Sequence, residues 1–148
     1  MNTLKEMLIR HEGWKNKPYR CPAGHKTIGV GWNLDANPLP ENIAAFLKLN
    51  GYITDEMINR LFDISIEAAT NNCRDIYIGF DSFSEPRRFA LIDFVFNVGV
   101  GTALKFKRTN AAINSGRWDD AAVGLMDSLY YKQVPNRAAE IVEMIRHG

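Results

Sequence analysis

Three residues near the N-terminus carry side chains that could act together in acid–base chemistry: Glu12, Cys21 and Thr27. Eight residues separate Glu12 from Cys21, and five separate Cys21 from Thr27. Hydrolysis of a glycosidic bond needs a protonated acid beside the leaving oxygen, because an alkoxide leaves poorly. A second group must hold a water, or attack the sugar itself, on the opposite face. Glu12 suits the first role, and Cys21 with Thr27 suits the second, although a glutamate at a helix end is commonly just solvated.

Two short elements must bring these side chains together. Thr3 and Glu6 have the spacing of a capping box, so they predict a helix that begins here. Gly13 should end this helix and leave Glu12 at its C-terminal edge. The stretch from Tyr19 to Leu34 predicts a small twisted β-hairpin, because Pro and Gly interrupt it and residues 27–31, Thr-Ile-Gly-Val-Gly, alternate β-branched residues with glycine. The glycines suit close backbone approach, so the hairpin and the helix end could form one wall of a cleft.

The rest of the chain predicts helices. The expected segments are Pro40–Leu49, a long helix from Thr54 to about Ile78, a buried helix from Ser84 through the apolar run Phe89–Val98 that ends at Gly99 and Gly101, and shorter helices at Asn110–Asn114, Trp118–Met126 and Asn136–Ile145. The predicted fold class is therefore a mainly helical α+β fold with two lobes. We expect a single domain over residues 1–148, with a small lobe at about 13–55, an interlobe helix at about 55–78, and a helical lobe at 79–148 that includes the N-terminal helix 1–12.

Composition narrows the function classes. The chain has 148 residues, with 18 Lys and Arg against 17 Asp and Glu, so its formal net charge is only +1. A dedicated nucleic-acid binder is usually strongly basic, and this balance argues against one. No segment has the roughly 20 apolar residues of a membrane span, and Met1–Arg10 lacks the apolar run of a signal peptide. We therefore expect synthesis in the cytoplasm and no stable membrane insertion, so an extracytoplasmic target would require a separate export route.

The two cysteines, Cys21 and Cys73, are expected to be free thiols rather than a disulfide. Cys21 and His25 lie four positions apart, so a cysteine-peptidase or amidase dyad has to be considered. The Pro-Ala-Gly turn between them offers no helix N-terminus to activate a thiolate. A metal site on the same pair would lack further ligands, so no metal is expected.

Four blocks of sequence resemble the lysozymes of T-even phages and their relatives. The first consists of His11-Glu12-Gly13, Tyr19 and residues 27–31. In this block the family has a Glu, then an Asp or Cys after eight intervening residues, and then a Thr after five more. The others are Arg87–Gly99, which is similar to the family's buried central helix, Gly116–Val123, which matches an "RWDEAA" helix, and Tyr130–Ala138, which matches a "Q-x-PNRA" segment. The blocks follow the family's order and cover nearly the whole chain.

This resemblance implies a muramidase that cuts the β-1,4 bond between N-acetylmuramic acid and N-acetylglucosamine, without a cofactor. Glu12 would be the general acid, and Thr27 with Cys21 would position the attacking water. Arg137 would face Glu12 and hold it in place, and residues near the family's sugar-binding groove are matched by Asn33, Phe96, Asn97, Phe106 and Arg137. The enzyme would be a monomer that acts on bacterial peptidoglycan, and its setting would be lysis of a phage host or virion entry. It would leave the host cytoplasm through a separate holin-like pore.

Departures from the T-even pattern leave alternatives open. Cys21 stands where the T-even enzyme has Asp, and a thiol with an ordinary pKa of ~8.5 is mostly uncharged at neutral pH. Cys21 could orient water, act as a thiolate base or form a covalent bond to the sugar, and water orientation with inversion is favoured. Trp32 replaces a histidine, and Asn97 replaces a glutamine that lines the cleft. Two other functions remain: a cysteine amidase acting on peptide stems, and a wall-binding module that has lost activity.

Overall fold

The structure, a computed structural model, describes residues 3–148. Its internal contacts divide the chain into two compact units, residues 1–65 and 66–148. The boundary falls inside a long helix, α3 (Asp55–Ile76). The predicted α+β class, mainly helical with a small N-terminal sheet, is confirmed. The assignment of both units to one domain stays a prediction.

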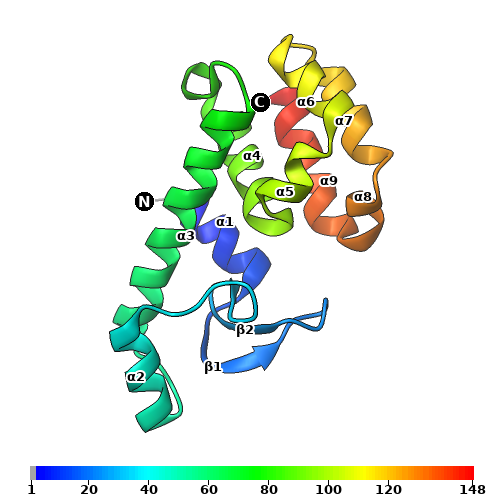
Figure 1. Ribbon diagram of the computed structural model, residues 1–148. Coiled ribbons are helices and arrows are strands. Elements are labelled where there is room, and N and C mark those ends of the chain that lie inside the picture. Colours follow the sequence, from blue (N-terminus) through cyan, green and yellow to red (C-terminus); the bar gives the residue numbers. More distant parts are fainter. Residues whose placement is uncertain (1–2) are drawn as a thin grey trace. The chain divides into compact units, whose positions relative to one another are not determined.

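The first unit contains two complete helices and the sheet of the described chain (Figure 1). In chain order its elements are α1 (Thr3–Glu12), β1 (Lys15–Arg20), β2 (Lys26–Gly29), β3 (Trp32–Asn33), α2 (Glu41–Asn50) and the first half of α3. Helix α2 begins after Pro40 and ends at Gly51, which has the left-handed backbone that favours glycine. Thr54 caps α3 because its hydroxyl oxygen accepts the Met57 N–H at 3.1 Å.

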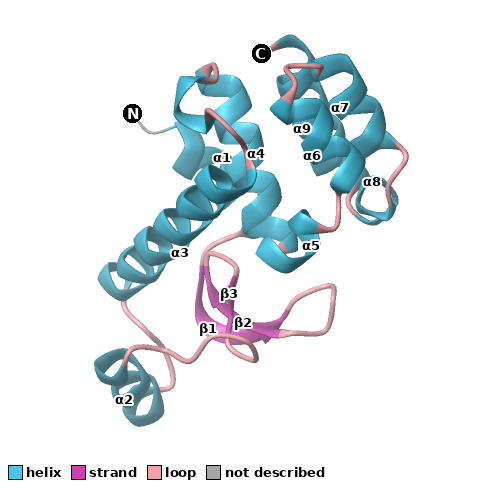
Figure 2. Ribbon diagram, turned by 45° about the horizontal axis from the view of Figure 1, so that its top comes forward, coloured by secondary structure: helices cyan, strands magenta, loops and turns pink. Residues whose placement is uncertain are grey.

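The three strands form one antiparallel sheet in the order β1-β2-β3 (Figure 2). Tyr19 lies opposite Thr27 in the first pair, and Thr27 lies opposite Asn33 in the second. The predicted hairpin is therefore present, but the third strand was not predicted, because two residues are too few to show a strand pattern. Gly29 and Gly31 both have φ +66°, so they allow the chain to turn sharply between β2 and β3.

Apolar side chains from every element of the first unit except β1 and β3 form its core. The buried residues are Leu4, Met7, Leu8, Ile28, Val30, Ile43, Ile53, Ile58, Leu61 and Phe62. A pair of backbone and side-chain hydrogen bonds ties the start of the hairpin to the start of α3: the Ile53 N–H donates to Asn16 O, and Asn16 Nδ2 donates to Ile53 O. Asp55 accepts hydrogen bonds from Asn16 and Trp14, which hold the pKa of its carboxyl below the usual range. The hairpin is thus anchored at its base.

The second unit is helical throughout. Its elements are the rest of α3, a 3₁₀ turn (Phe80–Ser82), α4 (Glu85–Val98), α5 (Val100–Leu104), α6 (Lys107–Asn114), α7 (Trp118–Met126), α8 (Leu129–Gln133) and α9 (Pro135–His147). Ser84 caps α4 by accepting the Arg87 N–H, and residues 90–95 are all buried, as the apolar run predicted. The Phe94 ring meets Phe106 and Tyr130 edge-on, with ring centroids 5.0 and 4.9 Å apart.

Several helix boundaries differ from the prediction. Gly99 does end α4, but Gly101 lies inside the short helix α5 rather than in a terminating turn. Helix α8 was missed, because five residues are too few to display a helical period. Residues 118–126 form α7 as predicted. Across residues 3–148, none of the helices combines the length and the apolar character that crossing a bilayer requires.

Candidate active site

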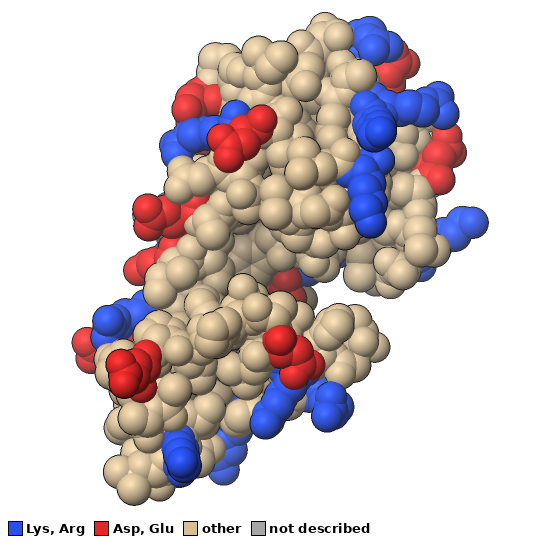
Figure 3. Space-filling view, in the orientation of Figure 1, with Lys and Arg blue, Asp and Glu red and all other residues tan. Residues whose placement is uncertain are grey.

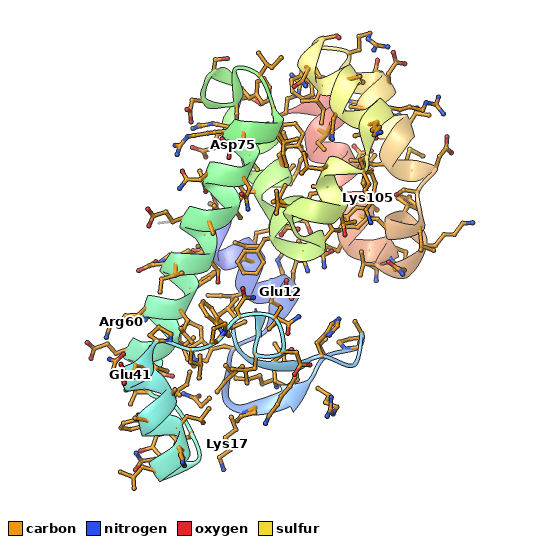
Figure 4. The ribbon with its side chains drawn as sticks, viewed as in Figure 1. Glu12, Lys17, Glu41, Arg60, Asp75 and Lys105 are labelled. Atoms are coloured by element: carbon orange, nitrogen blue, oxygen red, sulfur yellow. The ribbon has the colours of Figure 1, made fainter. Side chains whose placement is uncertain are left out.

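Glu12 is the last residue of α1, and its partly buried side chain lies where the helix meets the hairpin (Figure 4). The helix stops because Gly13 takes φ +85°, and its N–H closes the last turn on Ile9 O at 2.7 Å. The backbone therefore holds Glu12 at the helix end that the sequence predicted.

Gly31 leaves the space that the Glu12 carboxyl occupies. A Cβ added at Gly31 would lie 3.0 Å from Glu12 Cδ, 3.1 Å from Oε1 and 3.2 Å from Cγ. The carboxyl thus packs directly over the backbone of the β2–β3 turn. The glycines of residues 27–31 predicted a close approach of this kind, but the sequence did not reveal that Glu12 is the partner.

Cys21 and Thr27 come together through a tight turn at the tip of the β1–β2 hairpin. The Cys21 N–H donates to His25 O at 3.0 Å, and the Gly24 N–H donates to Cys21 O at 2.8 Å. Thr27 is buried, and its hydroxyl lies 2.9 Å from His25 O and within hydrogen-bonding reach of the Cys21 sulfur. The single hydroxyl proton of Thr27 therefore has two competing acceptors, the His25 carbonyl and the Cys21 sulfur.

This turn favours the thiolate form of Cys21. Burial by itself raises the pKa of the thiol, but hydrogen bonds from the backbone of His25, the Thr27 hydroxyl, and the backbone of Ala23 and Gly24 outweigh it, so the pKa is lowered overall. Cys73 is the opposite case, because it is fully buried in α3 and burial raises its pKa to about 12. Both cysteines are free thiols, as expected.

These two environments predict very different thiol reactivities. At pH 7.5, iodoacetamide should alkylate Cys21 at least about 100-fold faster than Cys73, since the thiolate is the reacting species and Cys73 is also buried. Thr27→Val should slow Cys21 alkylation, because it removes one hydrogen bond that stabilises the thiolate. Peptide mass spectrometry after timed quenching measures both rates. Equal rates for the two cysteines in the folded chain would contradict the geometry, while equal rates in urea serve as the control.

Tyr19 connects the acid to the thiol. Its hydroxyl donates to Glu12 O at 3.4 Å. Burial raises the pKa of the phenol, and the charges of Glu12 and then Cys21 raise it further. Both side chains therefore lie within electrostatic reach of one hydroxyl, so the structure gathers Glu12, Cys21 and Thr27 around Tyr19.

Asn33 also lies in the first unit, opposite Thr27. Its Oδ1 accepts the N–H groups of Asp35 at 2.9 Å and Ala36 at 3.1 Å. The amide oxygen therefore holds the turn after β3, as Asn side chains commonly do. A role of Asn33 in substrate binding stays a prediction.

The other predicted binding residues belong to the second unit. Arg137 Nε donates to Asp93 Oδ1 at 2.8 Å, and the two side chains are 9% and 0% exposed, so they form a buried ion pair. Sequence reasoning missed Asp93, although a charged residue within an apolar run was a visible signal. Phe96, Asn97 and Phe106 are partly buried, and Phe106 packs edge-on against Phe94. The pairing of Arg137 with Glu12 stays a prediction.

The distribution of charged side chains and of metal-ligating side chains narrows the kinds of site that this could be. No group of three or more His, Cys, Asp or Glu side chains within residues 3–148 has an arrangement that could hold a metal ion. On the face drawn in Figure 3, acidic and basic side chains are interspersed rather than gathered by sign. The side chains around the Tyr19 phenol are those of acid–base chemistry: a carboxyl, a thiol and a hydroxyl.

Comparison with known proteins agrees with the resemblance to phage lysozymes. A model of the phage lysozyme family matches residues 9–138. Two proteins of Dictyostelium discoideum are similar to this chain: probable T4-type lysozyme 1, 28% identical over an alignment of 166 positions, and probable T4-type lysozyme 2, 28% identical over 163 positions, gaps included. Both alignments cover all of this chain and 96% of the relative. The pre-baseplate central spike protein Gp5 of Enterobacteria phage T4 is 29% identical over an alignment of 160 positions, gaps included. This alignment covers 99% of this chain and 28% of that protein.

Proposed function

The chain belongs to the phage lysozyme family and is a peptidoglycan hydrolase of the lysozyme type, and from this premise we propose that it cuts the β-1,4 bond between N-acetylmuramic acid and N-acetylglucosamine. One observation carries the proposal. The Glu12 carboxyl packs over Gly31. The charges of Glu12 and Cys21 both act on the Tyr19 hydroxyl, and the Thr27 hydroxyl contacts the Cys21 sulfur. This arrangement offers a proton donor and a water-holding pair within one unit of the fold.

In the proposed reaction, Glu12 gives its proton to the glycosidic oxygen while the bond from that oxygen to the anomeric carbon breaks. A water held by Thr27 and Cys21 attacks the anomeric carbon from the opposite face and loses a proton to Cys21 or to solvent. The new carbon–oxygen bond inverts the configuration. Glu12 then recovers its proton from solvent. No cofactor takes part in these steps.

Cys21 offers a second route. As a thiolate it could attack the anomeric carbon directly and form a thioglycoside, which a water would then cleave with retention of configuration. The water-orienting role is preferred, because the Thr27 hydroxyl beside the sulfur gives the pair two atoms with which to hold a water. Cys21→Asp should therefore keep glycan cleavage, and a glycosyl adduct trapped on Cys21 would overturn the inverting mechanism.

Product analysis on purified peptidoglycan tests the function itself. New reducing ends without new free amines, appearing first as the α-anomer, are the expected result. New amines without reducing ends would identify a cysteine amidase acting through Cys21. Binding to the wall without either product would identify an inactive wall-binding module.

Gly31→Ala tests whether the packing of the acid matters. A Cβ at φ +66° costs about 1–2 kcal/mol of stability, and at Gly31 it must also push the Glu12 carboxyl aside. We expect turnover on peptidoglycan to fall at least about tenfold, because a displaced acid no longer meets the leaving oxygen. Gly51→Ala is the matched control, since Gly51, which ends α2 in the same unit, has φ +78° with no atom within 4 Å of the added Cβ. It should lose similar stability and keep full turnover, and a loss of activity in both variants would contradict the explanation.

The proposed setting is lysis of a bacterial host or entry of a virion. The relative named as a pre-baseplate central spike protein of phage T4 supports virion entry, because that name describes a part of the phage particle, although the alignment covers only 28% of that protein. The proposal also includes a monomeric enzyme, made in the host cytoplasm, that reaches the wall through a separate holin-like pore. The substrate-binding roles of Asn33, Phe96, Asn97, Phe106 and Arg137 belong to the same proposal and are carried by the resemblance.

A further inference from the structure

Tyr19 touches both halves of the proposed catalytic apparatus, and we infer that it is a positioning residue that sets the distance from the acid, Glu12, to the water-holding pair, Cys21 and Thr27. The inference rests on the proposed function, because it assigns Tyr19 a task in that reaction. Two contacts of Tyr19 carry it, one along the sheet and one to the helix.

The contact along the sheet places Tyr19 beside Thr27. The two residues are direct partners in the β1–β2 ladder, so their side chains stand on the same face of the sheet. The ladder is irregular between Lys15 and Tyr19, and Pro18 lies within that irregular stretch. A bulge turns the strand, which determines the direction in which the following side chain points. The irregular stretch thus sets the direction of the Tyr19 side chain, and the strand register keeps Tyr19 beside Thr27.

The contact to the helix is made by the hydroxyl. Tyr19 Oη donates to the backbone oxygen of Glu12 at 3.4 Å. Carbonyl groups in the last turn of a helix have no partner within the helix, so this phenol caps the end of α1 at the residue that carries the acid. Movement of that helix end relative to the hairpin would therefore break the hydrogen bond.

The electrostatic environment keeps the phenol in the form that can donate. Tyr19 is partly buried, and burial first, then the charges of the Glu12 carboxyl and Cys21, raise its pKa. The hydroxyl therefore keeps its proton wherever the enzyme would work. It acts through Glu12 and makes no proton transfer of its own.

Tyr19→Phe tests the inference, because it removes the hydroxyl and keeps the ring. We expect kcat on peptidoglycan to fall about tenfold while KM stays within about twofold, since the position of the acid is disturbed and substrate contacts are not. Tyr52→Phe is the matched control in the same unit: Tyr52 is 41% exposed and meets Phe46 edge-on, with ring centroids 5.6 Å apart. It should behave like the parent in both constants. A parent-like kcat for Tyr19→Phe, or a fall in kcat shared by both variants, would overturn the inference.

Hydrogen exchange gives a readout that needs no activity. The Gly13 amide is hydrogen-bonded to Ile9 O in the turn that Tyr19 caps, so its exchange should be about tenfold faster in Tyr19→Phe and unchanged in Tyr52→Phe. Faster exchange with full kcat would show that Tyr19 holds the helix end without positioning catalysis, which overturns the inference. If the parent cleaves no glycan, the proposed function fails separately. Parent-like exchange at Gly13 would then reject the role of Tyr19 as well, and faster exchange would support the contact.

Discussion

Glu12→Gln is expected to lower the turnover of peptidoglycan by about 10²–10⁴-fold, the usual contribution of a positioned general acid. The amide has the same shape and keeps the contact with Gly31, but it has no acidic proton for the leaving oxygen. KM should change little, because the substrate-binding surface is preserved. Release of reducing ends, followed over a range of substrate concentrations, measures both constants.

Glu6→Gln is the control for this substitution. Glu6 lies on the same helix, is exposed, and belongs to the capping-box spacing, in which glutamine is also accepted. It should retain parent activity and stability. Parent-like turnover in Glu12→Gln would remove the general acid from the proposed mechanism. Loss of turnover in both variants would indicate a general effect on α1.

Asp93→Ala is expected to produce the largest loss of stability, about 3–5 kcal/mol in the free energy of unfolding, because it breaks a buried ion pair from one side. Asp93 is 0% exposed, and its Oδ1 accepts the hydrogen bond of Arg137 Nε at 2.8 Å. Removal of the carboxylate leaves the guanidinium charge in a low-dielectric interior without this partner. Urea denaturation, with the midpoint and the slope both reported, measures the loss.

Asp81→Ala provides the matched comparison in the same unit. Asp81 pairs with Arg74 at 3.0 Å, but the two side chains are 66% and 49% exposed, so the pair contributes only about 0–1 kcal/mol. Removing both members of the buried pair, as in Asp93→Leu with Arg137→Met, should recover most of the lost stability, since neither member is then left buried without the other. A similar loss for Asp81→Ala and Asp93→Ala would show that burial does not set the strength of the Asp93–Arg137 pair.

Local signals in the sequence determined the elements that hold the site. Gly13 ends α1 and so places Glu12 at the helix terminus, and the β-branched and glycine pattern of residues 27–31 lies in the hairpin. Ser84 and the apolar run after it predicted α4, and α7 has the bounds expected from its helical spacing. Caps, turns and side-chain periods act over a few residues, which is why the chain reveals them without a partner. The four collinear blocks added the family, which the comparison over residues 9–138 confirmed.

Contacts between distant residues were decided only by the tertiary structure. The Glu12 carboxyl lies over Gly31, 19 positions later, and Asp93 pairs with Arg137 across 44 positions. The pairing of β3 and the hydroxyl contact of Tyr19 also depend on how separate segments pack. A sequence pattern gives the residue type and the local conformation, but the meeting of two side chains depends on the packing of every element between them. For this reason the chemistry could be predicted from residue types, while the groups that position it became visible only in the folded chain.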